Sequence, residues 1–457
     1  MTGRQVPVVP GKPIIGTLDA LRDDPLGTYE KARRDYGDVV LFTGGPPGMK
    51  VNLYTVFSPT GAQQILSAGT AANFRKDNLS YTEIRESFGD GLLTSQDERY
   101  LHQRRLVQPL FTRRRTDGYA DAVVTEARAM TDRWTAASGP DGVEVDAAAE
   151  MGELALRVVA RILFGADIES TVDVIRRNFP VMSDYVMHRV VSPVRLPRSV
   201  PTRVNRRAAA AREELHRVCD RIIAERRAAG QAPTADLLGQ LADATDENGQ
   251  PLTGDAVRDQ VLIFLFAGHE TTATTLGFAL HLLARHPEVQ RRARAEVDTV
   301  LGGREPAASD VDALPYLNMI VKETLRLYPS VAVLGRRSVA EAEIDGYRIP
   351  AGADLYLSPW VIHRHPAYWD QPERFDPERF TPERERQRHR YAWVPFGGGP
   401  RACIGMQLSM LESVLSLATV LQRVECTAVD TDVPVKVGMT MVADGTVRVR
   451  MAARVPA

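Results

Sequence analysis

The chain has 457 residues, of which 44% are hydrophobic and 25% are charged, as in an ordinary soluble globular protein with a large core. Its 57 basic and 58 acidic residues give a net charge of −1, which argues against a general affinity for nucleic acid. Its three cysteines, Cys219, Cys403 and Cys426, are odd in number and too few for a disulfide framework, so a reducing, intracellular setting is expected.

The first sixteen residues are rich in proline and predict an extended lead-in rather than a signal peptide. The longest apolar run, 261-VLIFLFAG-268, is shorter than the roughly 18 residues that a membrane span needs. We therefore expect a soluble, cytoplasmic protein without a membrane anchor.

Two β-favouring runs, 38-DVVLFT-43 and 50-KVNLYTVF-57, flank the turn sequence GGPPG and predict a hairpin. From about residue 95 to residue 330 the pattern is mostly helical. A Pro/Arg-rich stretch, 189–207, predicts a loop between two helices, and 246–255 predicts a turn.

The C-terminal part of the chain changes character. The stretch 343-EIDGYRIPAGADLYLS-358 predicts short strands joined by an Asp-Gly hairpin turn. Irregular chain follows to about residue 400, then one more helix and a β-like tail, 433–451. With no repeat and no linker, the sequence predicts a mainly α fold with a small β portion, as a single domain over residues 1–457.

Five segments carry residues that could take part in binding or catalysis. The first is 98-ERYLHQRRLVQPLF-111, which gathers basic residues on one short helix. The second, 255–287, predicts one helix of about 30 residues, or ~45 Å. In its middle, Thr271 can bond back to the carbonyl of Ala267 and bend the helix, which would open room for a small ligand and a water.

His269 and Glu270 in that helix suggest a zinc protease, but H-E-x-x-H requires a second histidine where Ala273 stands, so zinc is rejected. Taken alone, a core helix with polar residues on its exposed face is also a plausible interpretation of this segment.

The third and fourth segments are 323-ETLR-326 and 375-FDPERF-380. Glu323 and Arg326 are neighbours at i,i+3 on a helix with a regular apolar stripe, formed by Leu317, Ile320, Val321 and Leu325. An isolated E-x-x-R is usually a solvated pair that contributes a few tenths of a kcal/mol.

The fifth segment is 393-WVPFGGGPRACIGMQLSM-410. Its glycines match G-x-G-x-x-A, but a proline lies inside the match and no βαβ unit surrounds it, so a dinucleotide site is rejected. Glycines allow a backbone to approach a bulky group closely and to direct N–H groups at the sulfur of Cys403. A helix beginning near Ile404 would add its positive end, which suits a thiolate metal ligand. For this loop taken alone, a buried structural cysteine in a glycine-rich turn is the more common interpretation.

In this order and spacing, the five segments resemble those of a cytochrome P450, a haem-thiolate monooxygenase of the soluble bacterial type. The resemblance covers essentially the whole chain. It implies a helical bundle around haem b, with a long central helix and a β-rich region on the N-terminal side. It also implies that Cys403 is the axial ligand of the haem iron, that Phe396 packs beneath the haem, and that Gly405 allows close approach of the following helix.

The resemblance assigns further residues to the cofactor and to the core. Glu323, Arg326 and Arg379 correspond to a buried ion-pair triad. The residues expected to contact the haem or its propionates are Tyr100, His102, Arg104, Ala267, Arg336 and Arg401. Tyrosine at position 100 departs from the family's more usual tryptophan, and Arg337 adjoins Arg336, so the choice between these two arginines stays open.

The implied reaction inserts one oxygen atom from O2 into a C–H or C=C bond of an apolar substrate, such as a terpenoid, a polyketide, another secondary metabolite or a fatty acid. Glu270 and Thr271 correspond to the family's proton-relaying acid–alcohol pair. The residues implied to line the substrate pocket are Leu92, Phe264, Val331, Val333, Met439 and Met441. Arginines between Arg189 and Arg207 could receive a substrate carboxylate, although a solvated loop is the preferred interpretation.

Electrons are expected from a separate ferredoxin or flavodoxin-type donor with its reductase, because no flavin or iron–sulfur motif follows Cys403. Arg401 and the 386–390 neighbourhood are candidate docking charges, and a monomer is expected. Two alternatives stay open: a P450-type enzyme that uses peroxide or catalyses coupling or rearrangement, and a haem-binding sensor without catalysis. The intact Glu270–Thr271 pair favours the monooxygenase.

Overall fold

The computed structural model describes residues 3–45, 50–165, 169–192, 195–228, 237–245 and 252–454. Its internal contacts divide the chain into two units, Met1–Glu83 with Leu325–Cys403 and Ile84–Thr324 with Ile404–Ala457. We call these the first and the second unit. A single domain over residues 1–457 stays a prediction.

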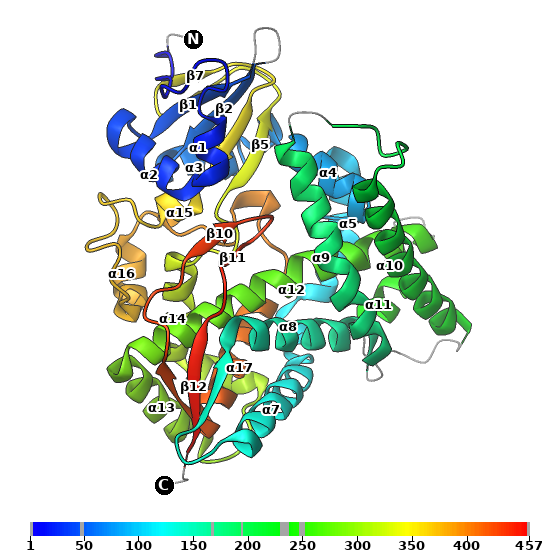
Figure 1. The fold of residues 1–457 in the computed structure, drawn as a ribbon, viewed down its shortest axis with the longest axis vertical. Helices are drawn as coiled ribbons and strands as arrows, with labels where there is room; N and C mark the ends of the chain where they lie inside the picture. The colour runs from blue at the N-terminus through cyan, green and yellow to red at the C-terminus, as the bar shows by residue number, and fades with distance from the viewer. Residues whose placement is uncertain are drawn as a thin grey trace. The chain divides into compact units, whose positions relative to one another are not determined.

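The first unit is built on a five-stranded sheet with the order β1-β2-β8-β5-β3. Its β1 and β2 pair antiparallel, β2 and β8 pair parallel, and β8, β5 and β3 pair antiparallel in turn. The strands are β1 (Val39–Gly44), β2 (Val51–Val56), β3 (Phe74–Arg75), β5 (Leu334–Ser338) and β8 (Asp354–Leu357). The predicted pairing of the first two strands is confirmed (Figure 1), while most of the GGPPG turn lies outside the described residues.

The Asp-Gly hairpin predicted near residue 345 is also present in the first unit. Strands β6 (Ala342–Ile344) and β7 (Tyr347–Ile349) pair antiparallel around Asp345 and Gly346. Both turn residues have positive φ, 48° and 78°, which is the backbone of a two-residue hairpin turn that Asp-Gly favours.

The helices and 3-10 turns of the first unit are α1 (Leu18–Asp23), α2 (Pro25–Tyr36), α3 (Pro59–Leu66), η1 (Ala71–Asn73), α15 (Pro359–Ile362), η4 (Pro377–Phe380), α16 (Pro382–Gln387), η5 (Arg390–Ala392) and η6 (Gly399–Arg401). Two helices, α4 (Leu79–Phe88) and α14 (Pro315–Leu327), have residues in both units. An apolar cluster that includes Val56, Ile65 and Leu357 forms a core of the first unit.

The second unit holds the long helices, as the sequence predicts for residues 95–330. They are α5 (Asp97–Val107), α6 (Arg113–Asp117), α7 (Ala120–Ala137), α8 (Ala147–Phe164), α9 (Glu169–Val191), α10 (Arg203–Ala228), α11 (Leu237–Asp243), α12 (Gly254–Arg285), α13 (Pro287–Leu301) and α17 (Met406–Arg423), with η2 (Gln108–Phe111) and η3 (Ala308–Ala313). A loop between two helices is confirmed, but it is shorter than the predicted 189–207, because α9 ends at Val191 and α10 begins at Arg203. The turn predicted at 246–255 lies mostly outside the described residues.

Helix α12 is the central packing element of the second unit, in contact with α8, α10, α11 and α17. It runs for 32 residues from a Thr253 cap, whose side-chain oxygen accepts from the N–H of Ala256 at 3.2 Å. Among the described residues, only this helix is long and apolar enough to cross a membrane, but 67% of its most apolar window is buried inside the protein. That burial is what the core helix of a globular protein shows, so the membrane evidence is weak.

Two small sheets complete the second unit. The order β4-β12-β9 joins Val143–Asp146, Arg448–Ala453 and Val424–Ala428 by antiparallel pairing. A separate hairpin pairs β10 (Val435–Val437) with β11 (Met441–Ala443). The β-like tail predicted from residue 433 is therefore confirmed.

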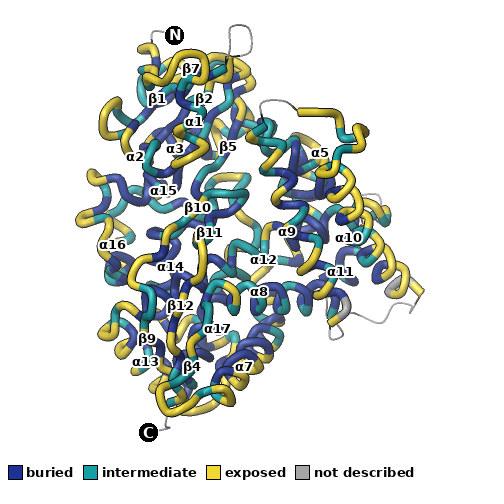
Figure 2. The backbone as a smooth tube through the Cα atoms, viewed as in Figure 1, coloured by how far each residue is buried: buried dark blue, intermediate teal, exposed yellow. Residues whose placement is uncertain are grey.

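Figure 2 shows that much of helix α10 is exposed.

Candidate functional site

Cys403 differs from the other two cysteines in its accessibility. Its residue is exposed, whereas Cys219 and Cys426 are buried. Burial raises the pKa of each buried thiol to about 12, so neither forms a thiolate near neutral pH. Of the three thiols, Cys403 is the accessible one.

The loop before Cys403 is closed by its own backbone. The N–H of Cys403 donates to the carbonyl of Phe396 at 2.9 Å. Gly397 and Gly399 have φ of 69° and 63°, in the left-handed region that favours glycine. A Cβ on Gly399 would lie 1.7 Å from the carbonyl oxygen of Leu66, so no other residue fits there without moving the backbone.

Helix α17 begins at Met406, two residues later than the predicted start near Ile404. Gly405 is its N-cap, and its carbonyl accepts from the N–H of Ser409 at 2.8 Å. The helix has no polar face over its central turns, because every residue from position 411 to 421 is buried. Among them is Glu412, where burial raises the pKa of the carboxyl to about 8.

The two candidate arginines on β5 have opposite environments. Arg336 is 3% exposed and donates to its neighbour's carbonyl, that of Gly335, at 2.7 Å. Arg337 is exposed and lies 3.7 Å from a carboxylate oxygen of Asp354. Successive side chains of a strand point to opposite faces, so one of the two must face inward, and it is Arg336.

The remaining candidate cations lie on α5 and in the cysteine loop. On α5, Tyr100 is buried, while His102 and Arg104 are half-buried. The Nε of Arg104 donates to Oε1 of Gln108 at 3.2 Å, one turn along. In the loop, Arg401 is half-buried within the 3-10 turn η6.

The middle of α12 carries a short accessible stretch between two buried stretches of the helix. Ala267 is exposed, positions 268 to 271 are partly exposed, and the residues from 260 to 266 are all buried. Thr271 donates its Oγ1 hydrogen to the carbonyl of Ala267 at 2.6 Å, as predicted. Thr272 is 2% exposed and lies outside the accessible stretch. An exposed alanine in a core helix leaves room for a ligand beside this turn.

The carboxyl of Glu270 is held by two hydroxyl groups from distant parts of the second unit. Thr440 donates to Oε2 at 2.9 Å, and Ser183 donates to Oε1 at 3.4 Å. Burial raises the pKa of Glu270, and these two hydrogen bonds partly offset the effect of burial. No sequence motif indicated either hydroxyl, although Thr440 lies between two residues predicted to line the pocket.

Burial also acts on His269, the neighbour of Glu270 on α12. It lowers the pKa of the imidazole to about 4, so this side chain is neutral at physiological pH. It packs edge-on against Phe179 of α9, with ring centroids 6.0 Å apart. His269 therefore contributes no charge beside the Glu270 carboxyl.

All three residues of the predicted triad are buried. Glu323 and Arg326 are both 0% exposed, and Arg379 is 7% exposed. The guanidinium of Arg326 donates to backbone carbonyls that lie far along the chain in the first unit, those of His363, Pro372 and Arg374. Arg379 donates to the carbonyl of Gln371 at 2.9 Å. The E-x-x-R motif is therefore an internal feature, not a solvated pair.

The predicted pocket residues fall into two groups. In the second unit, Leu92, Phe264 and Met441 are buried and Met439 is partly exposed; the N–H of Leu92 donates to Oε1 of Gln260 on α12 at 3.1 Å. In the first unit, Val331 and Val333 are partly exposed. Their role as a pocket lining stays a prediction.

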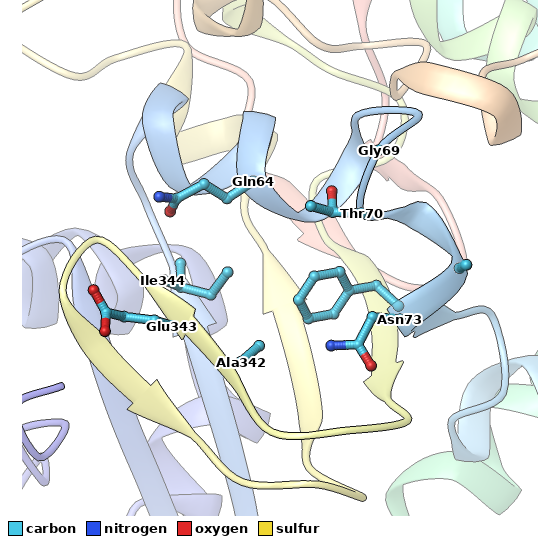
Figure 3. Close-up of a pocket in the computed structure, with 9 residues that line it drawn as sticks. Gln64, Gly69, Thr70, Asn73, Ala342, Glu343 and Ile344 are labelled. Carbon is cyan, nitrogen blue, oxygen red and sulfur yellow. The ribbon is translucent and has the colours of Figure 1, made fainter. Parts of the chain in front are cut away.

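A surface hollow of about 490 Å³ lies in the first unit, between α3, η1 and the β6 strand (Figure 3). Its walls include Gln64, Asn73 and Glu343. None of the predicted site residues lines it, and its described lining residues do not form a group of side chains typical of a catalytic site.

Two arginines of the stretch 189–207, Arg189 at the end of α9 and Arg198 in the following loop, are engaged within the second unit. Arg198 donates to Oε2 of Glu86 at 2.8 Å and lies 5.2 Å from the ring centroid of Tyr185. Arg189 donates to the carbonyl of Leu196 at 3.0 Å. These contacts tie the loop to α4 and α9, so the two side chains already have structural partners and are poor candidates for a substrate carboxylate.

A mainly helical chain with one accessible thiol in a glycine loop, and with an acid–alcohol pair in an accessible stretch of its central helix, has the features of a haem-thiolate oxygenase. The family model described as cytochrome P450 matches residues 6–448. The chain belongs to the cytochrome P450 family.

Relatives and solved structures agree with this assignment. The chain is 36% identical to cyclooctat-9-en-7-ol 5-monooxygenase of Streptomyces melanosporofaciens, over 90% of this chain and 87% of that protein. It is 32% identical to pentalenene oxygenase of Streptomyces avermitilis, over 97% and 96% of the two chains. The crystal structure of the cytochrome P450DA heme domain superposes with a TM-score of 0.89 at 30% identity, covering 100% of this chain and 99% of that one.

The predicted class, fold and cofactor are thus confirmed: the protein is a P450 monooxygenase of mainly α fold that uses haem b. Its activity requires an organic substrate, dioxygen and a source of electrons. The residues fit the cofactor, since an accessible thiol, an exposed alanine on the central helix and an inward-facing arginine are the groups a haem needs for its iron, its face and its propionates.

Proposed function

We propose that Cys403 is the thiolate ligand of the haem iron. The observation that carries this assignment is its exposure at the end of a closed glycine loop, while the other two thiols are buried and protonated. Phe396 and Gly405 shape the loop on either side of the sulfur. Ala267 is assigned to the haem face, and the propionates are assigned to Arg104, Arg336 and Arg401, with Tyr100 and His102 as further donors.

A thiolate-ligated haem, when bound, supplies the electron density that favours O–O cleavage. Proton delivery is assigned to Glu270 and Thr271. The raised pKa of the buried Glu270 carboxyl allows it to bind and release a proton nearer to neutral pH than an exposed carboxyl does. Because the hydrogen of the Thr271 hydroxyl goes to the carbonyl of Ala267, its oxygen acts toward a water as an acceptor and can order that water.

Thr271→Ala is expected to uncouple the reaction. The variant keeps the thiol and the loop but loses the hydroxyl that orders the proton-carrying water. Oxygen is still consumed, while more of the electrons end in hydrogen peroxide. The measurement is the ratio of product formed to reduced nicotinamide consumed, with surrogate electron donors, and we expect a fall of several-fold.

Thr272→Ala is the matched control for this experiment. Thr272 lies about 100° further around the helix and is buried outside the accessible stretch, so its loss leaves the ratio nearly unchanged. An unchanged ratio in Thr271→Ala would mean that protons arrive by another route.

The substrate is proposed to be an apolar, ring-containing terpenoid. Two matched relatives are named for oxygenation of cyclooctat-9-en-7-ol and of pentalenene. The residues assigned to the pocket, Leu92, Phe264, Val331, Val333, Met439 and Met441, are all apolar. Two of the arginines that could have held a substrate carboxylate, Arg189 and Arg198, are engaged elsewhere, which weakens the case for a fatty acid.

Ligand-induced change of the haem spin state tests this substrate class. Titration with cyclic terpenoid hydrocarbons and alcohols is expected to shift the Soret band toward the high-spin form at micromolar concentration. Fatty acids and polyketide lactones serve as the comparison ligands. A shift with fatty acids alone would overturn the assignment.

The electron donor is proposed to be a separate ferredoxin or flavodoxin-type protein with its reductase, and the protein to be a soluble, cytoplasmic monomer without a membrane anchor. Of the candidate docking charges, Arg388 lies 4.0 Å from the ring centroid of Trp369 and is structural. Arg386 and Arg390 are exposed, and Arg401 is half-buried, so these three stay candidates.

A further inference from the structure

The carboxyl of Glu270, the acid proposed for proton delivery, is hydrogen-bonded to two elements that lie far apart in the sequence. Thr440 lies in the turn between β10 and β11, and Ser183 lies on α9. Their hydroxyls donate to different oxygens of Glu270, at 2.9 Å and 3.4 Å. The carboxyl is therefore fixed in orientation as well as in position, with the shorter bond from Thr440.

The β10–β11 turn has a second attachment to the same helix. Thr274, one turn after Glu270 on α12, donates to the carbonyl of Met441 at 2.9 Å. Two hydrogen bonds one turn apart thus fasten adjacent residues of the hairpin to α12. Only one of them, from Thr440, involves the carboxyl. Thr274 therefore offers a control that separates attachment of the hairpin from orientation of Glu270.

The electrostatic surroundings of Glu270 are otherwise sparse. From α9, the charge of Asp184 raises its pKa, and from α12 the neighbouring His269 is neutral. Glu153 of α8 acts on His269 rather than on Glu270. Among the described residues, no positively charged group contributes to the shift in the pKa of Glu270. The two hydroxyls are therefore the groups that favour the ionised form of its carboxyl.

We propose that Thr440, assisted by Ser183, is a positioning residue for proton delivery. It orients the Glu270 carboxyl and couples proton release from that carboxyl to the β10–β11 turn and to α9. This inference rests on the proposed role of Glu270. A hydroxyl that donates to a carboxylate stabilises the ionised form. Without the Thr440 hydroxyl, only the longer bond from Ser183 opposes the effect of burial, so the carboxyl keeps its proton to higher pH and loses its fixed orientation.

The test compares four variants as haem-loaded enzyme: Glu270→Gln, Thr440→Val, Thr440→Ser and Thr274→Val. Infrared difference spectra of the resting protein between acid and alkaline pH report the C=O stretch of the protonated carboxyl, which Glu270→Gln identifies by its loss. In Thr440→Val we expect the titration of this band to move to higher pH and its frequency to rise, because the C=O group loses a hydrogen-bond donor. Thr440→Ser restores both values, and Thr274→Val changes neither.

The product yield per reduced nicotinamide supplies the functional readout. It is expected to fall several-fold in Thr440→Val, to recover in Thr440→Ser, and to show an optimum displaced to higher pH in the valine variant. If Glu270→Gln uncouples turnover while Thr440→Val matches the parent in band and yield, this inference fails and the role of Glu270 stands. If Glu270→Gln does not uncouple, the proposed relay itself fails. Equal effects of Thr440→Val and Thr274→Val would overturn the inference in favour of hairpin attachment.

Discussion

Arg326→Ala is expected to yield little soluble, haem-loaded protein. The arginine is fully buried, and its guanidinium donates to three backbone carbonyls at 2.6 to 3.1 Å, those of His363, Pro372 and Arg374. It also lies 5.1 Å from the ring centroid of Trp369. These contacts hold together the irregular chain that precedes the cysteine loop, in which helices and sheets satisfy few of the backbone groups.

The expected loss in free energy of unfolding decides whether the Arg326→Ala protein still folds. Glu323, its predicted ion-pair partner, is fully buried one turn earlier on the same helix. Removing one member of a buried ion pair costs about 3–5 kcal/mol, and each buried carbonyl left without a donor costs about 1–3 kcal/mol more. A whole domain is stable by only about 5–15 kcal/mol. The loss therefore approaches the total stability of the protein.

The chain contains a natural control with the same residue types at the same spacing. Glu383 and Arg386 form an i,i+3 pair on α16, with side chains 68% and 71% exposed. Arg386→Ala is expected to change the free energy of unfolding by a few tenths of a kcal/mol. Expression yield, haem content and urea denaturation of the two variants provide the comparison. Normal yield and haem content in Arg326→Ala would show that the buried network is dispensable.

Local sequence chemistry predicted much of the fold. The Asp345–Gly346 turn, the β1–β2 pairing and the limits of α12 all follow from short-range preferences for turns, alternation and helical capping. The back-bond from Thr271 to Ala267 is likewise local, since it joins residues four apart on one helix. Such features need no knowledge of the tertiary structure.

The features that sequence analysis missed are contacts between distant segments. Thr440 and Glu270 are 170 residues apart, and neither the spacing nor the residue types predict their hydrogen bond. The same holds for His363, whose Nε2 accepts from the N–H of Val394 at 2.8 Å. The choice between Arg336 and Arg337 was also open, because it depends on which face of β5 turns inward.

The division of the chain also lies beyond local preferences. Residues from both ends of the first unit's sequence pair in one sheet, as when β2 pairs in parallel with β8 about 300 residues later. A parallel pairing at that separation involves no hairpin turn, so no turn motif in the sequence indicates it. The sequence predicted both strands, but it did not predict that they are neighbours.

Cys403→Ser is expected to abolish the spectral signature of a thiolate-ligated haem. A serine hydroxyl stays protonated at neutral pH and cannot replace a thiolate as the electron-donating ligand. Cys219→Ala and Cys426→Ala are the matched controls, because both thiols are buried and protonated. Alanine is used at these two positions because a buried hydroxyl without a partner would be destabilising.

The most direct test is the reduced, carbon monoxide-treated spectrum of these three variants and the parent protein, recorded per haem bound. The parent, Cys219→Ala and Cys426→Ala are expected to show the red-shifted Soret band of a thiolate-ligated haem, and Cys403→Ser is expected to lack it. Retention of that band in Cys403→Ser, or its loss in either control that still binds haem, would contradict the assignment of Cys403 as the ligand of the haem iron.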